Sequence, residues 1–158
     1  MNTKIQNMKI ANYKKQILEQ FASYMILDFF HGEELQVYSE FYQRISLSEE
    51  VRRKRFGYYN PDTHEYLDDA IPYTKAFEYF ITNSSMFYEE ESVIYFIQYH
   101  EEYFGLKVLF QPSLFATKQQ SNCKNLLVIN EKQTKLLALD FLEYEIEVLV
   151  YRRAELYQ

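Results

Sequence analysis

Glycine and proline are scarce in this sequence, with only three of each among 158 residues. Loops that cradle phosphate groups need closely spaced glycines, because glycine lets the backbone approach the phosphates. Neither G-x-G-x-x-G nor G-x-x-x-x-G-K-[ST] can be drawn on the chain. The shortage therefore argues against nucleotide enzymes of the Rossmann and P-loop types, and we expect no cofactor.

Cysteine is nearly absent too, because Cys123 is the only one. One thiol cannot form an intramolecular disulfide, and no signature of a catalytic cysteine surrounds it. The N-terminal segment has basic residues but lacks the continuous apolar stretch of a secretion signal. No apolar run approaches the roughly 18 residues that a membrane-spanning helix needs. We therefore expect a cytoplasmic protein without a membrane partner.

Aromatic residues and negative charge are what the chain has in excess. It contains 16 Tyr and 13 Phe, and 23 acidic against 17 basic residues give a formal net charge of −6. A hydrophobic fraction of 47% is far from the composition of disordered chains. The length fits one domain, so we expect residues 1–158 to form a single domain.

Apolar residues recur at helical spacing through most of the first hundred residues. Gly32 offers a left-handed stop for the first helix, and Ser48 offers a cap for the third. The segment VIYFIQY has strand propensity, but its acidic N-terminal and glycine C-terminal flanks favour a helix. We predict helices at about residues 8–31, 33–45, 48–55, after Pro72 and 86–104.

After Gly105 the pattern changes to short apolar runs separated by polar turns. LKVLF, NLLVIN and LLALDF are such runs, and Tyr144, Ile146, Val148 and Val150 alternate with Glu145, Glu147 and Leu149, a period near two that is typical of strands. A single helix over residues 134–157 is the competing interpretation. We predict an α+β fold in which an N-terminal helical portion (about residues 8–104) packs with a small C-terminal antiparallel sheet (about residues 106–152). An all-α fold is the alternative.

The stretch from Phe21 to Phe30 is apolar on most sides if it is helical. A helix that is apolar all round must be buried on several sides. It is then either the central helix of the fold or part of an interface with a second copy across a two-fold axis. We favour the homodimer slightly.

A basic run followed by aromatic residues is the sharpest local feature of the sequence. Cations that neutralise phosphates beside rings that stack on bases are typical of nucleic-acid surfaces. The alternative is a solvated run that complements the end of a helix. The residues concerned are Arg52, Arg53, Lys54, Arg55, Tyr58 and Tyr59. No zinc-finger, RRM or KH motif accompanies the run. A nucleic-acid-binding regulator is therefore the first alternative and not the leading hypothesis.

Each of the three histidines is followed by acidic residues, and imidazole with carboxylates can bind a divalent metal. No HExxH motif is present, and acidic residues are abundant enough for coincidence. A small metal-dependent hydrolase is therefore the second alternative. Its metal ligands would be His64, Asp68, Asp69 and His100.

The absence of catalytic motifs and the surplus of tyrosine favour a binding protein. Tyrosine is enriched at recognition surfaces because it offers a large contact area at low entropic cost. In composition the chain resembles small accessory proteins of bacteria and their mobile elements, such as immunity proteins, antitoxins and phage inhibitors. The leading hypothesis is a non-enzymatic protein that occupies a surface of a partner protein. The net negative charge favours a basic partner.

Overall fold

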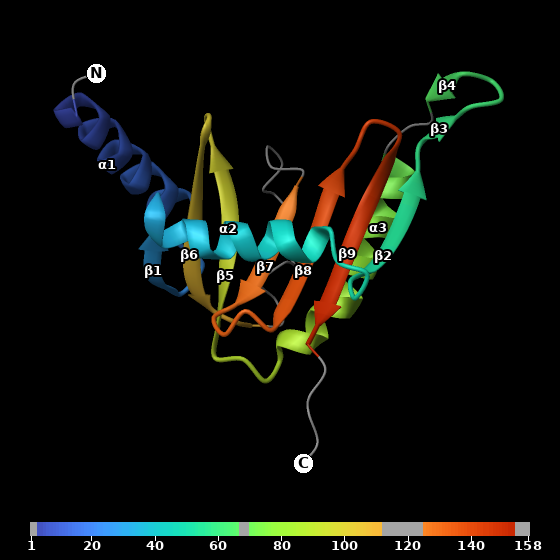
Figure 1. Cartoon of the computed structure of the whole chain (residues 1–158). Helices are drawn as coiled ribbons and strands as arrows, with labels where there is room; N and C mark the ends of the chain where they lie inside the picture. Colours follow the sequence, from blue (N-terminus) through green and yellow to red (C-terminus); the bar gives the residue numbers. More distant parts are fainter. Residues whose placement is uncertain (1–2, 67–69, 112–124, 154–158) are drawn as a thin grey trace, which may run out of the picture.

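The computed structural model describes residues 3–66, 70–111 and 125–153, which form three α-helices, a short 3-10 helix and nine strands (Figure 1). The elements follow one another as α1 (Thr3–Gln20), β1 (Ile26–Phe30), α2 (Glu33–Ser46), β2 (Arg52–Gly57), β3 (Tyr59–Asn60), β4 (Glu65–Tyr66), α3 (Ala70–Asn83), η1 (Ser84–Phe87), β5 (Ser92–Tyr99), β6 (Glu102–Leu109), β7 (Leu126–Asn130), β8 (Lys135–Phe141) and β9 (Glu145–Arg152).

One large antiparallel sheet organises the molecule. Its seven strands have the order β1-β6-β5-β7-β8-β9-β2, while β3 and β4 form a separate hairpin that projects beyond it (Figure 1). Both outer strands come from the first 57 residues of the chain. β1 pairs with β6 through Phe30 and Gly105, and β2 pairs with β9 over its whole length.

Helices cover both faces of the sheet. α2 crosses one face and buries Leu35, Phe41 and Ile45 against the central strands. α3 covers the other face behind β8, β9 and β2 (Figure 1). α1 packs on this second face from Ile10 to Ile17, which is fully buried, and its N-terminal end extends away from the sheet. The sheet thus separates two hydrophobic cores.

The predicted fold, with a small C-terminal sheet beside a helical portion, is wrong because β1 to β5 all lie within the supposed helical portion, and three of them belong to the seven-stranded sheet. β5 and the start of β6 occupy most of the stretch predicted as a helix over residues 86–104. In β5 the six residues from Ser92 to Ile97 are all buried, because helices cover both faces of the sheet there. A strand buried on both sides reads as a continuous apolar run, which periodicity cannot distinguish from a buried helix.

Two further helix predictions are wrong in the N-terminal part. α1 ends at Gln20, a turn follows, and residues 26–30 form β1, so the homodimer argument built on an apolar helix over residues 21–30 loses its basis. The basic run is strand β2 instead of the end of a helix. In the C-terminal part, β8 and β9 replace the alternative helix over residues 134–157. α2 and α3 are present where helices are predicted.

Within the described residues, no helix has the length and apolar character that crossing a membrane requires.

Gly105 lets α2 begin close to the sheet. A Cβ atom at this position would lie 2.6 Å from Leu35 Cδ1 and 3.3 Å from Ile94 Cγ2. Both neighbours are buried, so little room exists for them to move. We expect Gly105→Ala to lower the free energy of unfolding by about 1–3 kcal/mol, the usual cost of overpacking.

Gly57→Ala is the matched control, because a Cβ there meets nothing within 4 Å. It should change stability by less than about 0.5 kcal/mol. Urea denaturation of both variants measures the difference. Equal midpoints would show that α2 can shift away from β6 without cost.

Candidate functional site

The four consecutive cations lie on β2, at an open edge of the sheet. Because side chains alternate along a strand, they do not share a face. Arg53 Nη1 and Arg55 Nε donate hydrogen bonds to the two carboxylate oxygens of Glu147, at 3.1 and 3.2 Å. On the other face, the ammonium of Lys54 lies 4.9 Å from the centre of the Tyr79 ring.

This arrangement gives the basic run a structural role. Two of its cations pair with Glu147, and Arg55 also pairs with Glu145, so the run does not present one continuous cationic surface, and the nucleic-acid alternative gains no support from its geometry. A charged edge strand also discourages pairing with strands of other molecules.

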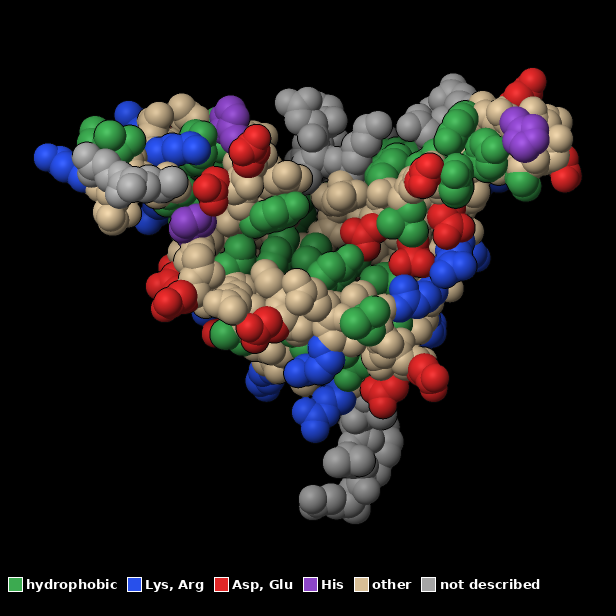
Figure 2. Space-filling model, turned by 45° about the horizontal axis from the view of Figure 1, so that its top comes forward, with side chains coloured by type: hydrophobic (Ala, Val, Ile, Leu, Met, Phe, Trp, Pro, Cys, Tyr) green, Lys and Arg blue, Asp and Glu red, His purple; other side chains and the backbone are tan. Residues whose placement is uncertain are grey.

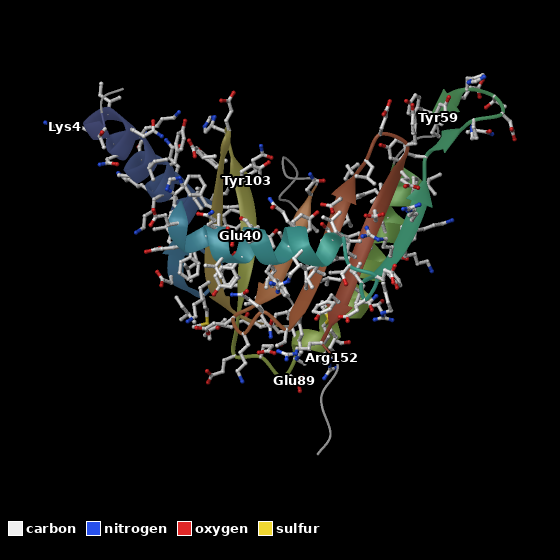
Figure 3. The ribbon with its side chains drawn as sticks, viewed as in Figure 1. Lys4, Glu40, Tyr59, Glu89, Tyr103 and Arg152 are labelled. Carbon is white, nitrogen blue, oxygen red and sulfur yellow. The ribbon has the colours of Figure 1, made fainter. Side chains whose placement is uncertain are left out.

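Four tyrosines gather at the projecting β3–β4 hairpin and the neighbouring β8–β9 turn. We call them the tyrosine cluster: Tyr58, Tyr59, Tyr66 and Tyr144. The Tyr59 ring lies 4.8 Å from that of Tyr66 and 4.7 Å from that of Tyr144, while Tyr58 lies 6.2 Å from Tyr66. The Tyr58 hydroxyl donates to the Leu142 carbonyl oxygen, which ties the hairpin to this turn. Figure 3 shows Tyr59 at this outer corner of the molecule.

The tyrosine cluster is partly exposed and has an acidic rim. Tyr58 and Tyr59 are partly buried. Tyr66 is 58% exposed and Tyr144 is 49% exposed. Asp62, Glu65 and Glu143 are exposed in the same two segments, and neither segment contains a lysine or arginine. A hydrogen bond to Glu143, together with its negative charge, raises the pKa of Tyr144. The surface is therefore aromatic at its centre and negative around it.

The residues predicted to bind a metal are not brought together where they can be placed. His64 lies in the β3–β4 hairpin, where its Nδ1 is 3.2 Å from the Tyr59 hydroxyl. His100 lies in the turn between β5 and β6, where its ring stacks on that of Tyr13 at 4.9 Å. This turn lies towards the edge of the sheet opposite to the β3–β4 hairpin (Figure 1). Asp68, Asp69 and the lone Cys123 lie outside the described residues. Among residues 3–66, 70–111 and 125–153, no three His, Cys, Asp or Glu side chains form a group that could hold a metal ion.

A hollow of about 1140 Å³ opens at the same end of the sheet as the tyrosine cluster. It lies where β5 and β8 end and β7 begins, with the upper side of α2 along one wall. Figure 2 shows hydrophobic side chains gathered there between two raised sides of the molecule. Its lining consists of Gln20, Phe21, Ser39, Tyr42, Gln43, Tyr95, Phe96, Ile97, Gln98, Tyr99, His100, Tyr103, Asn125, Leu126, Leu127, Asp140 and Phe141.

Asp140 is the one carboxylate among the described residues of this lining. It accepts a hydrogen bond of 2.7 Å from the Tyr42 hydroxyl on α2. Burial raises the pKa of Asp140, the Tyr42 hydrogen bond lowers it, and the nearby charge of Glu147 raises it further. Burial and the Asp140 carboxylate also raise the pKa of Tyr42, so the phenol stays protonated as the donor.

Sequence reasoning identified part of these sites and missed the rest. Tyr58 and Tyr59 were singled out as rings beside cations, whereas Tyr66 and Tyr144 join them only through the fold. Asp140 looked like an ordinary residue of an apolar strand. The available signal was its position, since it is the one charged residue in LLALDF.

Comparisons of the chain with models of known protein families, with curated proteins and with solved structures find no match.

Proposed function

We propose that this protein is a non-enzymatic binding protein that contacts a basic partner protein through the tyrosine cluster, in the manner of an immunity protein, antitoxin or inhibitor. The observation that carries the proposal is the packing of four tyrosine rings from two separate chain segments into one exposed surface. Tyr66 and Tyr144 do not serve to fill the hydrophobic core, because each is about half exposed.

The chemistry of the tyrosine cluster suits protein recognition. Tyrosine is among the residues that contribute most to binding energy, and it loses little conformational freedom when bound. Here the rings already contact one another, and Tyr58 and Tyr59 are tied by hydrogen bonds, so part of the ordering cost is met before binding. The acidic rim would attract a positively charged surface and speed its association.

A photo-crosslinking amino acid at position 66 tests the proposal. It should capture a partner from a lysate of the native host, and the same amino acid at position 88 should not. Tyr88 is a matched control, because it is 61% exposed and precedes β5 at the other end of the sheet. Equal capture at both positions would indicate non-specific contact.

The captured partner, once purified, then gives a quantitative test. We expect Tyr66→Ala combined with Tyr144→Ala to weaken binding by at least about tenfold, or roughly 1.4 kcal/mol. Tyr88→Ala should leave the affinity within about twofold of the original, and added salt should slow association. An affinity that is insensitive to the double substitution would contradict the proposed function.

A further inference from the structure

We propose that the hollow binds an organic cation, an amine or amidine with a flat apolar body, whose positive charge lies against Asp140. This site is separate from the tyrosine cluster, so the inference does not depend on the proposed function. It rests on the placement of one carboxylate, the chemistry of the lining and the size of the space.

Asp140 is a partly buried carboxylate without a cation. Its cross-strand neighbour is Glu147, but the two ion pairs at that position hold Arg53 and Arg55 on Glu147. In the part of the chain that the structure describes, no ion pair reaches Asp140, and its one hydrogen bond comes from Tyr42. A carboxylate has about four acceptor positions, and leaving a partly buried one uncompensated is unfavourable. A bound cation would supply the missing charge and donors.

The rest of the lining selects against anions and favours aromatic ligands. Among the described residues of the lining there is no lysine or arginine, so a phosphate or carboxylate ligand would find no permanently charged partner on them. Aromatic rings on the Asp140 face of the sheet can attract a cation through their faces. They are those of Tyr42, Phe96 and Tyr103, whereas Phe21, Tyr95, Tyr99 and Phe141 line the hollow from the other face.

Neutral polar groups in the lining fit the remaining part of such a ligand. Ser39 and Gln43 lie on α2 and Gln98 on β5, around a space that exceeds what a drug-sized molecule needs, about 300–1000 Å³. Tyr103, which is 60% exposed and pairs with Gln98 across β5 and β6, lies beside the hollow (Figure 3). These amides and hydroxyls can accept or donate hydrogen bonds without adding charge.

Three probes with the same ring separate charge from shape. Calorimetric titration of the full chain with benzamidinium, benzamide and benzoate should show binding of benzamidinium, at least about tenfold weaker binding of benzamide, and none of benzoate. In Asp140→Asn the preference for benzamidinium over benzamide should disappear. Asp28→Asn on β1 makes the same change of charge outside the lining and should leave all three results unchanged.

Asp140→Asn is expected to fold, because asparagine keeps an acceptor for the Tyr42 hydroxyl and removes an uncompensated charge. A second measurement uses the original chain with ¹³C-labelled aspartate. Benzamidinium should lower the pKa of Asp140, whose charged or titratable neighbours are Tyr42 on α2 and Glu147 on β9 with its two arginines. Failure of benzamidinium to bind, equal binding of benzoate, or an Asp140 pKa unmoved by bound benzamidinium would overturn the inference.

Discussion

Replacement of Phe104 by alanine should lower the free energy of unfolding by about 3–5 kcal/mol, the usual cost of removing a buried phenylalanine ring. Phe104 on β6 is fully buried. Its ring lies 5.2 Å from Phe29 on β1, 5.1 Å from His31 and 6.5 Å from Tyr13 on α1. The substitution should therefore weaken the packing of α1 and β1 against the sheet. Small domains are stable by only about 5–15 kcal/mol, so the variant should be close to unfolding.

Tyr103→Ala provides the control for this experiment. Tyr103 precedes Phe104 on β6 but points to the other face, and more than half of its surface is exposed. Its replacement should cost less than about 1 kcal/mol. Urea denaturation followed by circular dichroism measures both variants. Similar midpoints for the two would mean that the core around Phe104 is not tightly packed.

Glu147→Gln should have the second largest effect, a loss of about 3 kcal/mol, at the lower end of what breaking a buried ion pair costs. The Glu147 side chain is 8% exposed and holds both Arg53 and Arg55. The loss is not larger because Arg55 is 60% exposed and can turn its charge towards water. The free energy of unfolding at neutral pH, from urea denaturation, is the quantity to measure.

Glu145→Gln is the matched control for this charge. Glu145 also pairs with Arg55, at 3.4 Å, but its side chain is more accessible to water. Surface ion pairs contribute about 0–1 kcal/mol, so this variant should lose little stability. If both glutamine variants lost the same amount, burial of Glu147 would not be what makes its ion pairs matter.

A helix with one covered face is predicted well from its sequence pattern. α2 shows a helical stripe because only the side with Leu35, Phe41 and Ile45 meets the sheet. Elsewhere the pattern is misleading for physical reasons. β5 lacks alternation because both of its faces are buried. β2 has no apolar pattern because ion pairs hold part of it in place, and their acidic partner, Glu147, lies directly opposite Arg55 but far away in the sequence.

The candidate sites were predictable only where neighbouring residues in the sequence form them. The expectation that surplus tyrosine serves recognition of a partner follows from composition, and Tyr58 and Tyr59 could be named as rings from their position beside the basic run. Which other rings join them depends on the β8–β9 turn, which approaches only after the sheet has formed. The hollow depends on where β5 and β8 end relative to the start of β7, and no local pattern records that.

The pairing of the outer strands affects how the chain folds while it is being synthesised. β1 has its sheet partner in β6, and β2 has its partner in β9, which is the last strand of the described chain. A growing chain therefore leaves the ribosome with β2 unpaired until Glu145 and the residues after it have emerged. Long-range pairing of this kind forms slowly. During that interval the four positive charges of β2 repel the same strand of other unfinished chains, and so the edge that lacks its partner longest is also the best protected.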